Sequence, residues 1–539
     1  MEHPGTNFET YPFQNHTFSI RTERRELMRR SGKSLLAATW LAAFLIIPCL
    51  SMAADQDVQQ KLDSMAKEIE ALKKQVASAT PEKASGKSIS DWLTIGGDYR
   101  FRIDSLRGKI PDYFQFNPAD PFNPIPVPSS KVKNDILYTN RFGLDLKAKA
   151  TRNVSVTSRL VMYKAFGNND TAATSGTFFA DRIGAFDGTE GHVPNDGKIT
   201  VDTAYATWSN LFDRPVWFSV GRRPSTGGIP SHLRQNKPQP GQSGIPAILV
   251  DYAFDGMTLG WAPDIEALPG AYAKVCYGRG FENGITSTSG NGLHDTDMLG
   301  VSVVPYDTDP LHVSLQWNRG FNIFDSPVIA STTLPPPFSS LRPSTDLGDI
   351  DWFELTLLSA LKDIGPGRLH LFGSGGLSIT RPNTNTNAFG GGLMFNDDPL
   401  TPGLQGNESK TGWAAYLGAR YDFNRNRTKL GLEFNHGSKD WITFTPAADD
   451  MWTSKLGTRG NVYEAYLIQE FDLGPISSYT SKTFAKIGYQ YYDFDYTGSN
   501  NWVGAPVKIS DLKASPLNAQ FLTPLKNAQD IYMTLEVHF

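Results

Sequence analysis

Residues 530–539, the end of this 539-residue sequence, alternate strictly between apolar and polar side chains. In an extended strand, every second side chain points to the same face. One face therefore carries Ile531, Met533, Leu535, Val537 and Phe539, and the other carries Tyr532, Thr534, Glu536 and His538. We expect such a strand to separate an apolar environment from an aqueous one.

The same alternation returns along the sequence from Trp92 onward, and its polar positions often hold charges. In 93–102 and 141–149 these charged positions include Asp98, Arg100, Arg102, Arg141, Asp145 and Lys147. A charged side chain is costly against a dry core and ordinary against a water-filled lumen. We therefore expect an all-β fold, a transmembrane antiparallel β-barrel, because an open sheet would leave backbone polar groups unpaired in hydrocarbon and a closed sheet does not.

The terminal segment, with its aromatic carboxy-terminus, resembles the last strand of bacterial outer-membrane β-barrels. The resemblance implies that the alternating apolar residues from Ile531 to Phe539 are the insertion signal that the barrel-assembly machinery reads. It also implies that outer-membrane lipid and lipopolysaccharide surround the protein.

An export signal is predicted at the other end. Arg29, Arg30 and Lys33 precede the apolar run 35–48, and Ser51-Met-Ala53 fits a signal-peptidase site. We expect residues 1–53 to be cleaved off, with Met28 as an alternative start, and the mature protein to reach the bacterial outer membrane. Lipidation at Cys49 is an alternative that the preceding proline disfavours.

Residues 55–79 are predicted to form a short helical coiled coil. Apolar residues recur there at intervals of four and three, at Val58, Leu62, Met65, Ile69, Leu72 and Val76. We interpret the segment as a periplasmic stalk of a homotrimer; the alternative is an amphipathic helix packed elsewhere. Residues 80–90 are interpreted as a linker, and 91–539 as the barrel.

Sixteen strands satisfy the topology of bacterial barrels, which have an even strand number, short turns on the periplasmic side and longer loops outside. This count requires that 248–254 belong to a loop folded into the barrel. The predicted strands are 93–102, 138–149, 154–165, 199–208, 216–222, 257–262, 271–280, 296–304, 311–320, 350–361, 367–380, 412–423, 428–438, 460–473, 484–495 and 530–539.

A barrel of this size leaves an aqueous channel unless something blocks it. The sequence resembles porin-like families, including one of unassigned function that shares a stalk and a turn like Gly221-Arg-Arg-Pro224. The resemblance implies passive diffusion of small hydrophilic solutes.

The third outer loop is basic, since 214–250 contain no Asp or Glu. A positive constriction would favour anions; the alternative is a solvated loop that bridges lipopolysaccharide phosphates. The candidate pore-lining residues are Arg222, Arg223, His232, Arg234, Lys237, Asp98, Arg100, Arg102, Arg141, Asp145, Lys147, Lys429 and Glu433.

Other functions find less support in the sequence. The 51 basic and 55 acidic side chains give a net charge of −4, too small to indicate a nucleic-acid partner. We expect no catalytic activity, no cofactor and no specific metal site, and interpret Asp397, Asp398, Asp449, Asp450, Asp493 and Asp495 as solvated turns and not calcium ligands. The alternatives to a porin are a barrel sleeve for a multihaem cytochrome and a structural or adhesive barrel.

Overall fold

The computed structural model describes residues 89–539, apart from 118–119, 121, 169–186, 190, 286–292, 326–328, 331–339, 388, 398–406, 447 and 475–480. The predicted signal peptide, the predicted coiled coil and nearly all of the predicted linker lie outside the described residues. In the part of the chain that the structure describes, no helix is both long and apolar enough to cross a membrane.

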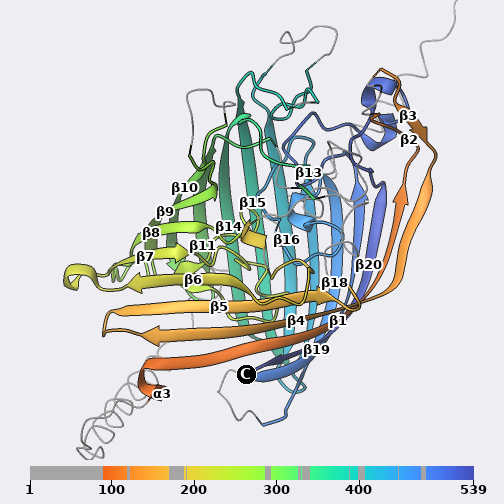
Figure 1. The fold of residues 1–539 in the computed structure, drawn as a ribbon. Coiled ribbons are helices and arrows are strands. Elements are labelled where there is room, and N and C mark those ends of the chain that lie inside the picture. Colours follow the sequence, from red (N-terminus) through yellow and green to blue (C-terminus); the bar gives the residue numbers. More distant parts are fainter. Residues whose placement is uncertain are drawn as a thin grey trace, which may run out of the picture. The chain divides into compact units, whose positions relative to one another are not determined.

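Sixteen antiparallel strands close into a barrel (Figure 1). A short helix, α3 (Ile89–Trp92), leads into the first of them. The barrel strands are β1 (Leu93–Ile110), β4 (Ser130–Lys149), β5 (Val154–Ala165), β6 (Thr200–Trp208), β7 (Val216–Arg222), β8 (Asp255–Trp261), β9 (Tyr272–Phe281), β10 (Thr296–Asp307), β11 (His312–Phe321), β14 (Gly348–Ile364), β15 (Gly367–Pro382), β16 (Thr411–Phe423), β17 (Thr428–Gly437), β18 (Gly460–Phe471), β19 (Lys482–Phe494) and β20 (Asn527–His538). The loops add two small sheets, β2 (Tyr113–Gln115) with β3 (Ile125–Val127), and β12 (Ile329–Ala330) with β13 (Ser340–Leu341).

The predicted closed barrel of sixteen strands is confirmed, and each predicted strand overlaps one strand of the structure. β20 pairs with β19 on one side and with β1 on the other, which closes the ring. His538 lies opposite Asp98 in this closure, and Glu536 lies opposite Arg100. The backbone of Phe539 extends the pairing through two hydrogen bonds with Gly97, of 2.9 and 3.0 Å.

Connections at the two ends of the barrel differ in length. The end that holds α3 and the carboxy-terminus has short links such as 365–366 and 424–427, whereas the other end has long loops such as 223–254 and 495–526 (Figure 1). This is the asymmetry that the sequence predicts for periplasmic turns and outer loops.

The two faces of the strands differ in chemistry as the alternation predicts. In β20, Ile531, Met533 and Leu535 point outward and remain 43–55% exposed. Thr534 and Glu536 point inward and are at most 4% exposed. An outward band of exposed apolar side chains around a closed sheet matches a lipid-facing surface.

The long loops fold into the barrel and build an apolar core there. It includes Leu249 and Phe444 from loops 223–254 and 438–459, and Trp352 from β14. Residues 247–250 are at most 1% exposed. The backbone of Phe444 donates to the carbonyl oxygen of Leu249 at 3.0 Å and accepts from the amide of Asp251 at 2.9 Å. The prediction that 248–254 fold inward is therefore confirmed.

The first two strands extend well beyond their predicted outer ends, 102 and 138. β1 continues to Ile110, and β4 begins at Ser130. The inward positions of this extension change from charged to apolar, at Leu106 and Ile110, because they pack against the inward loops beside Trp452 and Leu512. A register shift after Asp104 accompanies this change.

Candidate functional site in the barrel lumen

The tip of loop 223–254 reaches the opposite wall of the barrel. Arg420 of β16 donates to the carbonyl oxygen of Leu233 at 2.7 Å. Lys429 of β17 donates to Asn236 Oδ1 at 2.7 Å, and Lys482 of β19 donates to the carbonyl oxygen of Asn236. These bonds hold residues 231–237 across the lumen.

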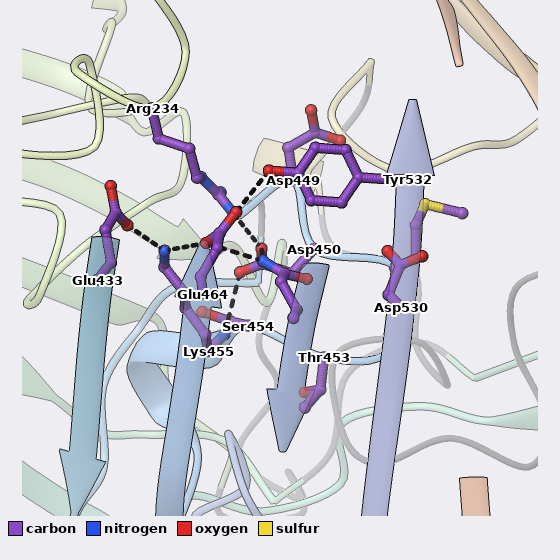
Figure 2. A network of polar contacts seen from close by, with 12 residues as sticks. Arg234, Glu433, Asp449, Asp450, Thr453, Ser454, Lys455, Glu464, Asp530 and Tyr532 are labelled. Atoms are coloured by element: carbon purple, nitrogen blue, oxygen red, sulfur yellow. Dashed lines mark hydrogen bonds and ion pairs between the residues drawn. The ribbon is translucent and has the colours of Figure 1, made fainter. Parts of the chain in front are cut away.

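Arg234, in this tip, enters a buried network of charges (Figure 2). Its Nη1 lies 2.5 Å from Asp450 of loop 438–459 and 3.3 Å from Glu464 of β18. Lys455 bridges Glu464, at 2.5 Å, and Glu433 of β17. The network therefore joins two inward loops to two strands of the wall.

Two hydroxyl groups donate further hydrogen bonds to these carboxylates. Tyr532 of β20 donates to Glu464 Oε1 at 2.6 Å, as Figure 2 shows, and Tyr416 of β16 donates to Glu433 at 2.5 Å. Buried charges are costly unless they are paired and hydrogen-bonded. The strand alternation supplies the wall groups, because Glu464 and Tyr532 occupy inward positions.

A row of arginines lines the neighbouring wall. Arg100 and Arg102 of β1 and Arg141 of β4 are at most 7% exposed and point inward. Asp449, from loop 438–459, pairs with Arg100 and lies 4.0 Å from Arg141. Arg102 pairs with the buried carboxylates Asp104, at 2.6 Å, and Asp530, at 3.0 Å.

Between the loop tip and this wall lies a cavity with about 370 Å³ of empty space, part of which opens to solvent. Six cationic side chains and two carboxylates line it: Arg100, Arg102, Arg141, Arg234, Lys237, Lys486, Asp449 and Glu536. The side-chain ammonium of Lys237 forms no ion pair or hydrogen bond with any other residue that the structure describes. The surface of the cavity is therefore positive, although Asp104, Asp530, Asp450 and Glu464 neutralise part of this charge from behind.

Burial and neighbouring charges change the acidity of the loop groups around the cavity. Burial alone would raise the pKa of Asp449, but Arg100, Arg102 and Arg141 outweigh it and hold that pKa well below its usual range. Burial, with Arg141 nearby, lowers the pKa of Lys237. Burial lowers the pKa of His232 to about 3, so its imidazole is neutral at physiological pH.

The structure thus brings five of the predicted pore-lining residues to one cavity: Arg100, Arg102, Arg141, Arg234 and Lys237. Glu433 reaches the adjacent network through Lys455. Asp98 does not line the cavity; it pairs with Arg141 at 3.5 Å and with Arg159. Lys429 fixes the loop tip through its hydrogen bond to Asn236, and its Nζ lies 2.8 Å from Glu470.

Five predicted residues lie away from this cavity or carry no ionic role in it. Asp145 and Lys147 are exposed near the short-turn end of β4. His232 is a buried neutral side chain of the loop tip. Arg222 pairs with Asp187 and Asp255, and Arg223 lines a separate cavity beside β8–β11.

The sequence prediction missed Lys486, Glu464 and Lys455, which shape the cavity and its network. Glu464 and Lys486 lie within predicted strands, and the alternation would have placed them inward. Asp449 and Asp450 were expected in solvated turns; this was wrong, because loop 438–459 folds inward and buries both carboxylates among arginines. Among the described residues, no group of three or more side chains is arranged to hold a metal ion.

Several solved structures have a similar chain trace, and three of them illustrate the likeness. OmpT, an outer-membrane protein of Vibrio cholerae in its trimer form, is 11% identical with a TM-score of 0.36, and the match covers 83% of this chain and 99% of that one. An anion-selective porin from Comamonas acidovorans is 11% identical with a TM-score of 0.38, and the match covers 83% of this chain and 99% of that one. OprB of Pseudomonas putida is 10% identical with a TM-score of 0.41, and the match covers 84% of this chain and 95% of that one. At these scores no function transfers from them to this chain.

No curated protein matches the sequence. A family model with the description "Protein of unknown function (DUF3373)" matches residues 131–539, well over half of the chain. The chain therefore belongs to the DUF3373 family.

Proposed function

We propose that this protein is a porin-like channel of the bacterial outer membrane that passes small hydrophilic solutes and prefers anions. The observation that carries the proposal is the lumenal cavity lined by six cations and two carboxylates. A positive surface in a confined lumen lowers the entry barrier for anions and raises it for cations.

The inward loops make this a narrow channel. They pack against the wall in an apolar core, and the loop tip is fixed to β16, β17 and β19. Conductance should therefore be lower than that of an empty sixteen-strand barrel. Lys237 supports the predicted positive charge of the constriction, because its ammonium lines the cavity and pairs with no carboxylate among the described residues.

The rest of the proposal concerns location and assembly. The exposed apolar band fits the lipid of the outer membrane, with lipopolysaccharide outside and a cleaved signal peptide for export. Phe539 and the apolar face of β20 are proposed as the signal for the barrel-assembly machinery. The coiled-coil segment 55–79 is proposed to support a homotrimer.

Reversal potential under a salt gradient in planar bilayers tests the anion preference. The purified barrel should be anion-selective, Lys237→Glu should reduce or invert the selectivity, and Lys237→Arg should preserve it. Lys439→Glu, at an exposed position of loop 438–459, is the matched control and should have little effect. Cation selectivity of the unaltered protein would overturn the proposal.

The inward loops also favour a second candidate, a structural barrel whose lumen stays closed. Trp441 and Trp452, inside the barrel, are at most 1% exposed, so part of the lumen is as tightly filled as a protein core. Absence of ion conductance would support this candidate against a channel. The same loops occupy space that a cytochrome would need, which weighs against the sleeve alternative. No catalytic function is proposed.

A further inference from the structure

A second cavity lies inside the barrel, between loop 223–254 and the inner wall of β8–β11. It holds about 460 Å³ of empty space, part of which opens to solvent. Its lining is mainly apolar and includes Ile245, Phe254 and Met298. An apolar lining with a few polar groups is typical of small-molecule sites.

The wall of this cavity is kept bare on one side by glycine. A Cβ atom at Gly278 of β9 would lie 2.8 Å from Cβ of Phe254, closer than such contacts allow. The backbone of β9 therefore forms part of the cavity surface at Gly278, and a side chain at that position would displace the loop. The cavity thus depends on how the loop packs against the wall.

One cation in the lining lacks a counter-ion. Arg223 is 8% exposed, and no carboxylate pairs with it among the residues that the structure describes. Its Nη1 donates to the Ser219 hydroxyl and its guanidinium lies 5.1 Å from the Tyr205 ring centre, but its Nε has no hydrogen-bond partner. Its neighbour Arg222 instead pairs with Asp187 at 2.7 Å and Asp255 at 3.2 Å.

Lys274 of β9 adds positive charge to the same region. Its side chain is 3% exposed and donates to the carbonyl oxygens of Gln242, at 2.9 Å, and Gly244. A buried charge without a partner is expensive in a protein interior. An arginine that is buried, unpaired and set in an apolar cavity is complementary to a carboxylate, whose two oxygens match the guanidinium fork.

We propose that this cavity binds a small amphipathic monocarboxylate, with the carboxylate on Arg223 and the apolar part against Ile245, Phe254 and Met298. The proposal concerns a site separate from the charged cavity of the lumen, so it stands whether or not the barrel conducts ions.

Calorimetric titration of the full-length barrel in phosphatidylcholine nanodiscs with hexanoate tests the site. Hexanoate should bind, whereas hexanol, which lacks the charge, and acetate, which lacks the apolar chain, should bind at least tenfold more weakly. Arg223→Met should weaken hexanoate binding about ten- to hundredfold, since a charge-assisted hydrogen bond contributes an affinity difference of that order. Arg223→Lys should retain part of the affinity.

Two further variants locate the binding. Arg214→Met removes an exposed arginine from the 209–215 link and should leave hexanoate affinity unchanged. Ile245→Trp should fill the cavity and abolish binding while Arg223 remains. Heat-dependent gel mobility confirms that each variant is a folded barrel, and Ile245→Trp serves if Arg223→Met does not fold.

Cys276, which lines the cavity, gives an independent signal. Bound hexanoate should slow alkylation of its thiol by iodoacetamide in the unaltered protein but not in Arg223→Met. Absence of hexanoate binding, or equal affinity in the unaltered protein and a folded Arg223→Met variant, would overturn the proposal.

Discussion

Arg234 and Asp450 form a buried ion pair, at 2.5 Å, between the loop that follows β7 and the loop that precedes β18. Both side chains are at most 8% exposed. The pair joins loop 223–254, which crosses the lumen, to loop 438–459, so the two inward loops hold each other in place. The lumen of this barrel is therefore shaped by loop–loop contacts as much as by its wall.

Asp450→Asn should weaken the contact between these two loops. The change leaves Arg234 with Glu464 at 3.3 Å as its remaining carboxylate, and breaking a buried pair typically costs about 3 kcal/mol or more. We expect a lower denaturant midpoint and, if the barrel conducts, larger conductance fluctuations. The control is Asp472→Asn, which breaks the exposed pair with Arg427 and should cost less than about 1 kcal/mol. Equal effects of both changes would contradict this account.

Gly221→Ala should destabilise the barrel. Gly221 has a φ of +125°, and a Cβ there would lie 2.4 Å from the carbonyl oxygen of Ala204 on the paired strand β6. We expect a loss of roughly 1–3 kcal/mol in the free energy of unfolding. Gly375→Ala, where a Cβ meets no atom within 4 Å, should be nearly neutral. Indistinguishable denaturation curves for the two variants would refute the steric argument.

Asp251→Asn should stabilise the protein at neutral pH. Burial raises the pKa of Asp251, in loop 223–254, from 3.8 to about 6. Below the unfolded value both states are protonated, and the carboxyl contributes no pH dependence. As the pH rises from about 4 to 6, the unfolded chain loses this proton first, so stability falls, and the deficit above pH 6 is roughly 3 kcal/mol.

Urea unfolding at two pH values checks this prediction. Asn keeps the side-chain oxygen that accepts from the Gly227 amide at 3.2 Å, but it carries no charge. The variant should gain stability at pH 7.5 and show little change at pH 4. A gain of the same size at both values would rule out ionisation of Asp251 as its cause.

Deletion of Phe539 should impair barrel assembly. It removes both backbone hydrogen bonds to Gly97 and the aromatic end of the apolar face of β20. We expect a smaller folded fraction in outer-membrane extracts, measured by heat-dependent gel mobility, while Phe539→Tyr should assemble normally. Normal assembly of the deletion variant would show that Phe539 is not part of the insertion signal.

Local patterns predicted the wall of this barrel well. The alternation in 93–102 and 530–539 depends only on neighbours along the chain, so it gave the strands, the inward charges and the closing pair. The rule of even strand number then indicated that 248–254 fold inward, which the burial of Leu249 confirms. The extension of β1 to Ile110 was missed because its inward side chains turn apolar where they meet loops.

The partners across the lumen were beyond prediction from sequence. Asp450 and Arg234 are far apart in the chain, and neither carries a local signal for the other. Arg459, the residue before β18, illustrates the same limit. It is 1% exposed, and its guanidinium donates to the carbonyl oxygens of Trp441, Gly498 and Asn501, in two different loops, at 2.7–3.0 Å. Only the three-dimensional packing of the loops specifies such contacts.

The pairing of β1 with β20 has a consequence for the order of folding. Of the sixteen barrel strands, β20 comes last in chain order, so the edge of β1 at Asp98 stays unpaired until His538, 440 positions later, has been synthesised. Until then the chain exposes two unpaired strand edges, which are templates for aggregation. Closure of this barrel therefore requires β20, and the chain must be kept from pairing with other chains until that strand is available.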